Sequence, residues 1–572
     1  MKNTALYLFL PLVLIAQQDP PRGSTRQRPG QTQQSQPAPT KPEDLAALEG
    51  QVVNAVTGEP LGKAALILRR ADSQPGPPGM GGPARSYSTS SDSSGKFRMG
   101  NIEPGKYRLS ATRTGFVAAE FGARDYMQAG ATFTLDAKQN MRDMMFRMTP
   151  NGVITGKVVD EDREPVAFLQ VQAMRHRYSQ GKKQLVSYGS ATTNDIGEYR
   201  IFGLPPGRYY ISVSARRSYG PDRSGAAQQG PEEEYVATFY PGTTEAATAA
   251  ALDIGPGALF SGANVALGKR STVHVKGRVS DASSTGTERR RPMVFLVPRA
   301  LSGASSMMRP SSIDANGNFD IRGITAGSYT LVALIQDRGK SLMTRMAVEV
   351  GNSNVENLSI TINPALSLSG AVRLDGEAVA SVSTAQVSLR PRDPIGTIPG
   401  SSNPTSKVNA DGSFTLSNIS ADHYNVTLSG LPDGFYVKSV SLGGQDALLA
   451  GLNLSSGAAG PIDIVLAPNA GQAVGVVQND QQQPAPGVTV VLIPQERERK
   501  EQAQYYKTAT TDAAGTFTFK NLDPGQYKVY AWKEVESGAY MDPEFVGPVE
   551  NRGATVTIRE GSQENLQVKL IG

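Results

Sequence analysis

A pattern of glycine and tyrosine occurs five times along the 572 residues, and it limits the possible folds more than any other feature. Each copy contains an Asp/Asn-x-x-Gly-x-Phe/Tyr turn, with turn glycines Gly95, Gly197, Gly317, Gly412 and Gly515. A tyrosine follows twelve residues later, as Tyr107, Tyr209, Tyr329, Tyr424 and Tyr527. A short stretch with a further glycine precedes each turn, at Gly50, Gly156, Gly277, Gly370 and Gly475. Five copies with fixed internal spacing predict five tandem structural units.

The residues within one copy predict strands and tight turns. The Asp or Asn accepts backbone N–H bonds, and the glycine adopts a positive φ without a Cβ clash. The strand that begins at each tyrosine alternates apolar and polar residues, as in Tyr527-x-Val529-x-Ala531. Alternation predicts a sheet with one buried face. About seven such strands per ~100 residues indicate an immunoglobulin-like sandwich, so the expected fold is all-β, in tandem modules.

The repeat spacing sets the expected domain boundaries. We expect a signal peptide, a disordered Pro/Gln-rich linker and five modules, over residues 1–16, 17–44, 45–149 (module 1), 150–268 (module 2), 269–364 (module 3), 365–468 (module 4) and 469–572 (module 5). Lys2 and the apolar run from Ala5 to Ala16 are typical of a secretory signal. That run is too short for a membrane-spanning helix, which needs ~20 apolar residues. Export to the periplasm, the cell surface or the medium is therefore predicted, with no integral span after signal removal.

One family shares these motifs. In module 5, Gly475-Val-Val477 is followed by Asp512-x-x-Gly515-x-Phe517 and then by Pro524-Gly525-x-Tyr527. This arrangement resembles the carboxypeptidase regulatory-like domain, and modules 1, 2 and 5 resemble it best. The resemblance implies a transthyretin-like Greek-key sandwich of the carbohydrate-binding-like group, as in bacterial envelope proteins. It implies no catalytic role, because that domain is an appendage of the peptidases.

Composition and motifs favour a protein that is not an enzyme. The formal net charge is +5 and the one dense basic run lies in a loop, so no nucleic-acid partner is expected. The count of cysteines is zero, which excludes a cysteine nucleophile. The three histidines are His176, His274 and His423; they fall in different modules and none has a glutamate three residues later. We therefore expect no catalytic residue, no cofactor and no metal site.

One segment has the oxygen side chains of a calcium loop. Asp314, Asn316, Asn318 and Asp320 alternate around Gly317, as calcium ligands do. The matching positions of the other copies do not keep these side chains, whereas the turn residues recur. A structural turn is therefore the favoured interpretation.

Exposed aromatic side chains are the candidates for ligand contact. The candidates are Tyr235, Tyr240, Tyr505, Tyr506, Trp532 and Tyr540. Aromatic rings pack against sugar faces when they are exposed and against the core when they are buried. Two functions stay open: a structural or interaction protein that binds through loops, and a glycan-binding protein that uses these rings. The expected partner is a polysaccharide or another envelope protein.

Overall fold

The structure is a computed structural model of the chain. It describes residues 44–71, 86–123, 130, 132–179, 181–214, 232–283, 290–299, 309–311, 313–337, 340–377, 380–393, 403–457, 460–512 and 514–572. The predicted signal peptide and all of the predicted linker except Asp44 lie outside the described residues. Over the described ranges, no helix combines the length and the apolar character needed to cross a membrane.

The opening strand of each module is the centre of one sheet. In module 1, β1 (Ala46–Asn54) pairs antiparallel with β4 (Lys96–Ile102) and parallel with β8 (Asn140–Met148). The other opening strands have the same two kinds of partner: β9 (Gly152–Val159) with β12 (Glu198–Leu204) and with β17 (Leu259–Phe260) and β18 (Val265–Ala266); β19 (Lys269–Asp281) with β22 (Asn318–Ile324) and β25 (Val355–Ile362); β26 (Leu366–Leu374) with β29 (Ser413–Ile419) and β34 (Ile462–Ala467); β35 (Gly471–Gln478) with β38 (Thr516–Leu522) and β41 (Gln563–Ile571). One topology therefore recurs along the whole chain, modules 3 and 4 included.

The second sheet of each module is built on a strand with two antiparallel neighbours. These trios are β2 (Ala65–Arg70) with β3 (Ser86–Ser90) and β5 (Gly105–Thr112); β10 (Gln170–Ser179) with β11 (Lys182–Thr192) and β13 (Gly207–Ser214); β20 (Met293–Pro298) with β21 (Arg309–Ser311) and β23 (Gly327–Asp337); β27 (Gln386–Pro391) with β28 (Thr405–Lys407) and β30 (His423–Ser429); β36 (Thr489–Pro494) with β37 (Lys507–Thr510) and β39 (Gly525–Trp532). The predicted fold class, all-β with tandem immunoglobulin-like/transthyretin-like sandwich modules, is confirmed.

Additional strands and short helical segments complete the modules. The additional strands are β6 (Ala119–Glu120), β7 (Phe133–Leu135), β14 (Glu232–Tyr235), β15 (Thr238–Phe239), β16 (Leu252–Ile254), β24 (Lys340–Val350), β31 (Tyr436–Leu442), β32 (Gln445–Asp446), β33 (Leu452–Asn453) and β40 (Ala554–Ile558). The helical segments are single turns or little more: η2 (Ala246–Thr248), α1 (Arg497–Lys500), η5 (Ala503–Tyr505), η6 (Ala539–Met541), α2 (Pro543–Val546) and η7 (Gly547–Arg552).

The glycine of each opening strand lies opposite the aromatic residue of the turn motif. These register pairs are Gly50 with Phe97, Gly156 with Tyr199, Gly277 with Phe319, Gly370 with Phe414 and Gly475 with Phe517. A Cβ atom on Gly475 would lie 2.6 Å from the Phe517 ring and 2.5 Å from the Leu566 carbonyl oxygen. Only glycine leaves room for the ring this close to the strand, and this close approach explains why the glycine recurs.

The repeated tyrosines bind the backbone four residues before them. The five hydroxyl groups donate to carbonyl oxygens at 2.6–2.9 Å: Tyr107 to Glu103, Tyr209 to Pro205, Tyr329 to Thr325, Tyr424 to Ser420 and Tyr527 to Asp523. All five side chains are buried. A buried ring with its hydroxyl satisfied by a nearby carbonyl is the tyrosine corner of Greek-key sandwiches.

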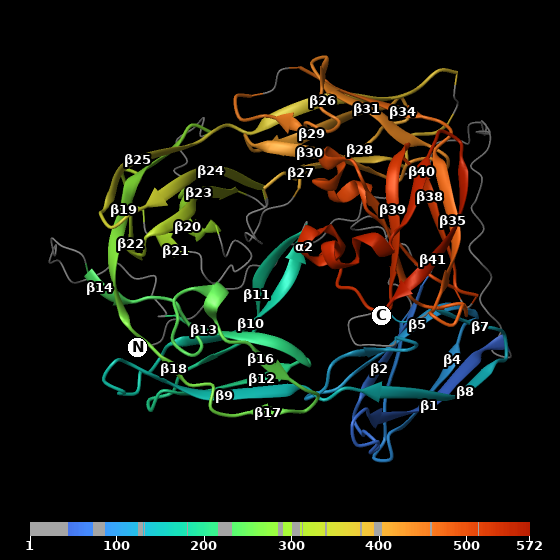
Figure 1. Cartoon of the computed structure of the whole chain (residues 1–572), viewed down its shortest axis with the longest axis horizontal. Coiled ribbons are helices and arrows are strands. Elements are labelled where there is room, and N and C mark those ends of the chain that lie inside the picture. Colours follow the sequence, from blue (N-terminus) through green and yellow to red (C-terminus); the bar gives the residue numbers. More distant parts are fainter. Residues whose placement is uncertain are drawn as a thin grey trace, which may run out of the picture.

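Five hydrophobic clusters follow one another along the chain. They span residues 46–148, 154–267, 273–362, 368–466 and 473–568, and each lies within one predicted module. The module boundaries themselves stay a prediction. Figure 1 shows that the modules do not form a straight row: they follow one another around a loop, so that module 5 returns toward the hairpin of β10 and β11 in module 2.

Candidate functional site

The hairpin of β10 and β11 extends beyond the rest of its sheet. β10 pairs with β13 only from Gln170 to Met174, whereas its pairing with β11 continues to Ser179 and Lys182. The outer half is therefore a two-stranded arm, which Figure 1 shows pointing to the middle of the molecule, toward α2. Two strands alone are marginally stable in water, so the arm depends on what it contacts.

The tip of the arm packs against the helical segment of module 5. The Tyr178 and Phe545 rings meet edge to face, with centroids 6.3 Å apart. A Cβ atom on Gly181 would lie 2.8 Å from the Met541 carbonyl oxygen, and one on Gly538 would lie 3.3 Å from the Tyr178 Cβ. The arm and module 5 are thus in close contact through backbone and ring atoms, although these residues lie more than 350 positions apart in the sequence.

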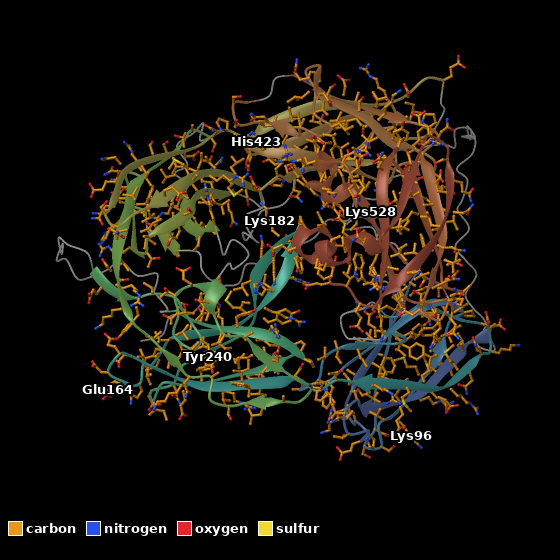
Figure 2. The ribbon with its side chains drawn as sticks, viewed as in Figure 1. Lys96, Glu164, Lys182, Tyr240, His423 and Lys528 are labelled. Carbon is orange, nitrogen blue, oxygen red and sulfur yellow. The ribbon has the colours of Figure 1, made fainter. Side chains whose placement is uncertain are left out.

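The same tip also reaches module 4. The Lys182 Nζ lies 3.3 Å from the Asp393 carboxylate (Figure 2 labels Lys182 near the middle of the molecule). The backbone carbonyl of Asp393 accepts a hydrogen bond from Arg345 of module 3. Modules 2, 3 and 4 therefore meet at one residue. We call Tyr178, Gly181, Lys182, Asp393, Gly538, Met541 and Phe545 together the clasp.

Module 3 joins module 4 through a mostly buried ion pair. The Arg345 guanidinium lies 2.6 Å from the Asp422 carboxylate, and their side chains are 18% and 8% exposed. Two residues before each repeat tyrosine a second turn follows, with Gly105, Gly207, Gly327 and Gly525 in the other copies, and Asp422 stands at this position in module 4. The hydroxyl of Ser420 accepts from the Met343 backbone N–H at 3.0 Å, which satisfies one donor on the edge strand β24.

The other junctions are also polar. Between modules 4 and 5, the Tyr436 hydroxyl donates to Glu560 at 2.6 Å and the Gly434 N–H donates to Asn521 at 2.9 Å. Between modules 2 and 3, β14 adds antiparallel to β19, and Lys269 pairs with Glu161 at 3.2 Å. Between modules 1 and 2, the Asn151 N–H donates to the Gly115 carbonyl at 2.9 Å. Paired polar groups at every junction favour one arrangement of the modules over a flexible string.

Four of the six aromatic candidates lie in module 5, and three of them, Tyr506, Trp532 and Tyr540, share one apolar cluster. Trp532 and Tyr505 are each 4% exposed, and Trp532 stacks on Tyr530 with centroids 5.2 Å apart. The Tyr506 ring lies 6.1 Å from the ring of Tyr540 in η6, and residues of α2 and η7 pack against the same cluster. Burial raises the pKa of Tyr506 to about 12. Trp532 and Tyr505 are thus too deeply buried to offer a ring face to a sugar. Over Trp532, the segment of η6, α2 and η7 forms a second apolar layer on this sheet.

Of the two aromatic candidates of module 2, only Tyr235 is placed at the junction with module 3. Tyr235 belongs to β14, and the Lys269 ammonium lies 5.6 Å from its ring centroid. Tyr240 packs against the module 2 core and is partly exposed. A role for these two rings in ligand binding stays a prediction.

The turn residues of the repeat have the expected geometry: the glycines adopt positive φ, and Asp314 accepts backbone N–H bonds. The five turn glycines have φ between 73° and 86°. In the segment that resembles a calcium loop, one Asp314 oxygen accepts from the Asn316 and Asn318 backbone N–H groups at 2.8 Å, and the other accepts from the Asn318 side chain. Asp314 thus stabilises the turn itself. Among the described residues, no three His, Asp or Glu side chains gather as a metal would require.

The histidines occupy three separate environments. His176 lies on the arm, its ring 4.9 Å from that of Tyr210, and its Nδ1 is buried without a partner. His274 Nδ1 lies 2.9 Å from Asp320, and His423 is an exposed residue of β30. Sequence reasoning did not find the clasp, because pairing of residues so far apart leaves no local pattern.

Comparison with known proteins bears on the family. The model of the carboxypeptidase regulatory-like domain matches residues 47–149, 153–237 and 473–570, together half of the chain. The chain belongs to this family. The carboxypeptidase regulatory-like domain therefore recurs in modules 1, 2 and 5, as the motifs predicted, and modules 3 and 4 share its strand pairing. No curated protein matches.

Several solved structures are similar to this regulatory-like chain. GBS52, the minor pilin of Streptococcus agalactiae, is 13% identical, with 43% of this chain and 99% of the pilin covered and a TM-score of 0.22. The Bacillus anthracis TIE protein is 10% identical, with coverage of 93% and 76% and a TM-score of 0.14. BcpA, the major pilin subunit of Bacillus cereus, is 11% identical, with coverage of 56% and 99% and a TM-score of 0.16.

Proposed function

We propose that this protein is an exported structural or interaction protein, which holds five regulatory-like modules in a fixed closed arrangement and binds another envelope protein through its outer surfaces. The clasp carries the proposal. Because residues of three modules contact one another at the clasp, the outward surfaces of these modules are held at fixed positions. Loops on such rigid sandwiches are where recognition commonly resides.

Export is the second part of the proposal. It is supported by the basic start and the 12-residue apolar run of residues 5–16. A lack of cysteine also suits an oxidising compartment, because no thiol is exposed there to unwanted disulfide formation. Cell fractionation of the full chain and of a chain that begins at residue 17 tests this part: only the former should leave the cytoplasm.

The binding role is tested with the purified chain from residue 17 onward as bait. When the wild-type chain is cross-linked to intact envelopes, it should capture one protein partner, and the same partner at low and at moderate salt. A matched bait with Tyr178→Ala and Lys182→Ala should capture less of it, because the clasp is open. Equal capture by both baits would contradict a role for the closed arrangement. Hydrolytic turnover by the purified chain would favour an enzyme instead, and retention by polysaccharide alone would favour a glycan-binding protein.

A further inference from the structure

Module 2 has an apolar row on the outer face of one sheet. Phe202 on β12 and Leu259 on β17 are 71% and 63% exposed. Val153 on β9 lies between them: it pairs with Leu259, and its neighbour Ile154 pairs with Ile201, the neighbour of Phe202. Ile154 and Ile201 point into the core, so Val153 and Phe202 point outward from adjacent strands.

The other modules have no such row. At the place of Phe202 they have Gly100, Arg322, Ser417 and Lys520, all exposed. At the place of Val153 they have Ala47, His274, Ser367 and Gln472. Leu259 corresponds to Asn140 in module 1 and to Gln563 in module 5. The fold therefore does not need apolar side chains here, and their presence on module 2 alone points to a contact outside the chain.

We propose that this row is the centre of a contact between two copies of the chain, sheet face against sheet face. Sheets pack face to face at about 10 Å with apolar side chains between them. In a two-fold contact each copy presents the same patch. When the two-fold axis passes near Val153, the apolar row of one copy therefore packs against the apolar row of the other.

The surroundings of the row suit a second copy. Glu198 of β12 lies across from Lys157 of β9, and Arg200 lies two residues from Phe202 on the same strand. The rim thus carries charges of both signs, and two such faces meet without a large excess of one charge. Three side chains cover much less than the roughly 800 Å² per partner of a standard interface, so the dimer is weak and reversible.

Module 5 supplies the design of the test. The variant Val153→Gln, Phe202→Lys, Leu259→Gln places on module 2 the residues that module 5 has at these positions: Gln472, Lys520 and Gln563. The matched control is Phe168→Lys, which changes a side chain that is 73% exposed with φ 61°. Module 1 has Lys63 with φ 60° at that place. Both substitutions therefore copy a residue that the fold already accepts elsewhere.

Sedimentation velocity of the chain from residue 17 onward, over a rising concentration series, measures the association. The wild type and Phe168→Lys should form a dimer at high concentration, and the triple variant should dimerise about tenfold more weakly or not at all. A wild type that stays monomeric throughout, or a triple variant that dimerises equally, would overturn the proposal. So would a different envelope protein that occupies the row.

A single cysteine gives a second measurement, because the natural chain has none. Val153→Cys treated with a short bis-maleimide should yield a covalent dimer, and Phe168→Cys should not. This result decides the question even where the triple variant fails to fold, and equal cross-linking of both variants would contradict the assigned face.

Discussion

The Arg345 guanidinium of module 3 contacts the Asp422 carboxylate of module 4 at 2.6 Å, in a pair that is largely shielded from water. Asp422 is the one departure from glycine at the second turn of the repeat. The departure therefore has a structural use: the position that reverses the chain in other modules binds a neighbouring module here.

Removal of one partner of this pair should be costly. Arg345→Met leaves the Asp422 charge buried without its partner, and we expect a loss of about 3 kcal/mol in the stability of module 4 against urea. Asp422→Gly in the same chain should recover part of the loss, since it removes the second charge and restores the repeat glycine. Losses that simply add in the double variant would contradict direct coupling.

Gly475→Ala should destabilise module 5, because the new Cβ would clash with the Phe517 ring at 2.6 Å. We expect a cost of about 1–3 kcal/mol, as for overpacking in a core. Gly547→Ala is the matched control: a Cβ there meets no atom within 4 Å, and the residue is helical. Thermal denaturation of both variants decides, and equal melting temperatures would mean that the glycine is not needed for close approach.

Tyr424→Phe should cost about 1 kcal/mol, since it removes the bond from its hydroxyl to the Ser420 carbonyl at 2.9 Å and leaves the ring in place. Tyr188→Phe serves as the control, because Tyr188 is 43% exposed. Urea denaturation that finds no difference between the two variants would contradict a stabilising role for the tyrosine corner.

The arm should weaken in acid. Partial burial and then the charge of Lys183 lower the pKa of His176 below its usual 6.5. The unfolded state therefore binds the proton more readily, so the stability from neutral His176 is present above pH 6.5 and is lost as the pH falls below that value. Hydrogen exchange of the arm should rise between pH 7.5 and pH 5, after correction for intrinsic rates. His176→Gln should remove this rise, and an unchanged rise in the variant would assign it to another group.

Much of the fold was predictable because turn and core residues leave local patterns. Gly515, Phe517 and Tyr527 each mark a position whose backbone or burial is set by neighbours within one module. The chain alone did not reveal that Trp532 packs beneath α2, because η6, α2 and η7 are too short to leave a periodic pattern in the sequence. Nor did it reveal the meeting point at Asp393, since contacts between distant modules depend on the path of the whole chain.

The closed arrangement is the central claim, and one engineered disulfide tests it most directly. A Cβ on Gly538 would lie 3.3 Å from the Tyr178 Cβ, close to the ~3.8 Å typical of disulfides. Tyr178→Cys with Gly538→Cys, in a chain free of other cysteines, should therefore form an intramolecular disulfide in air, seen as a shift in non-reducing gel mobility. Two thiols that stay free and fully reactive in the folded monomer would contradict closure of the arm on module 5.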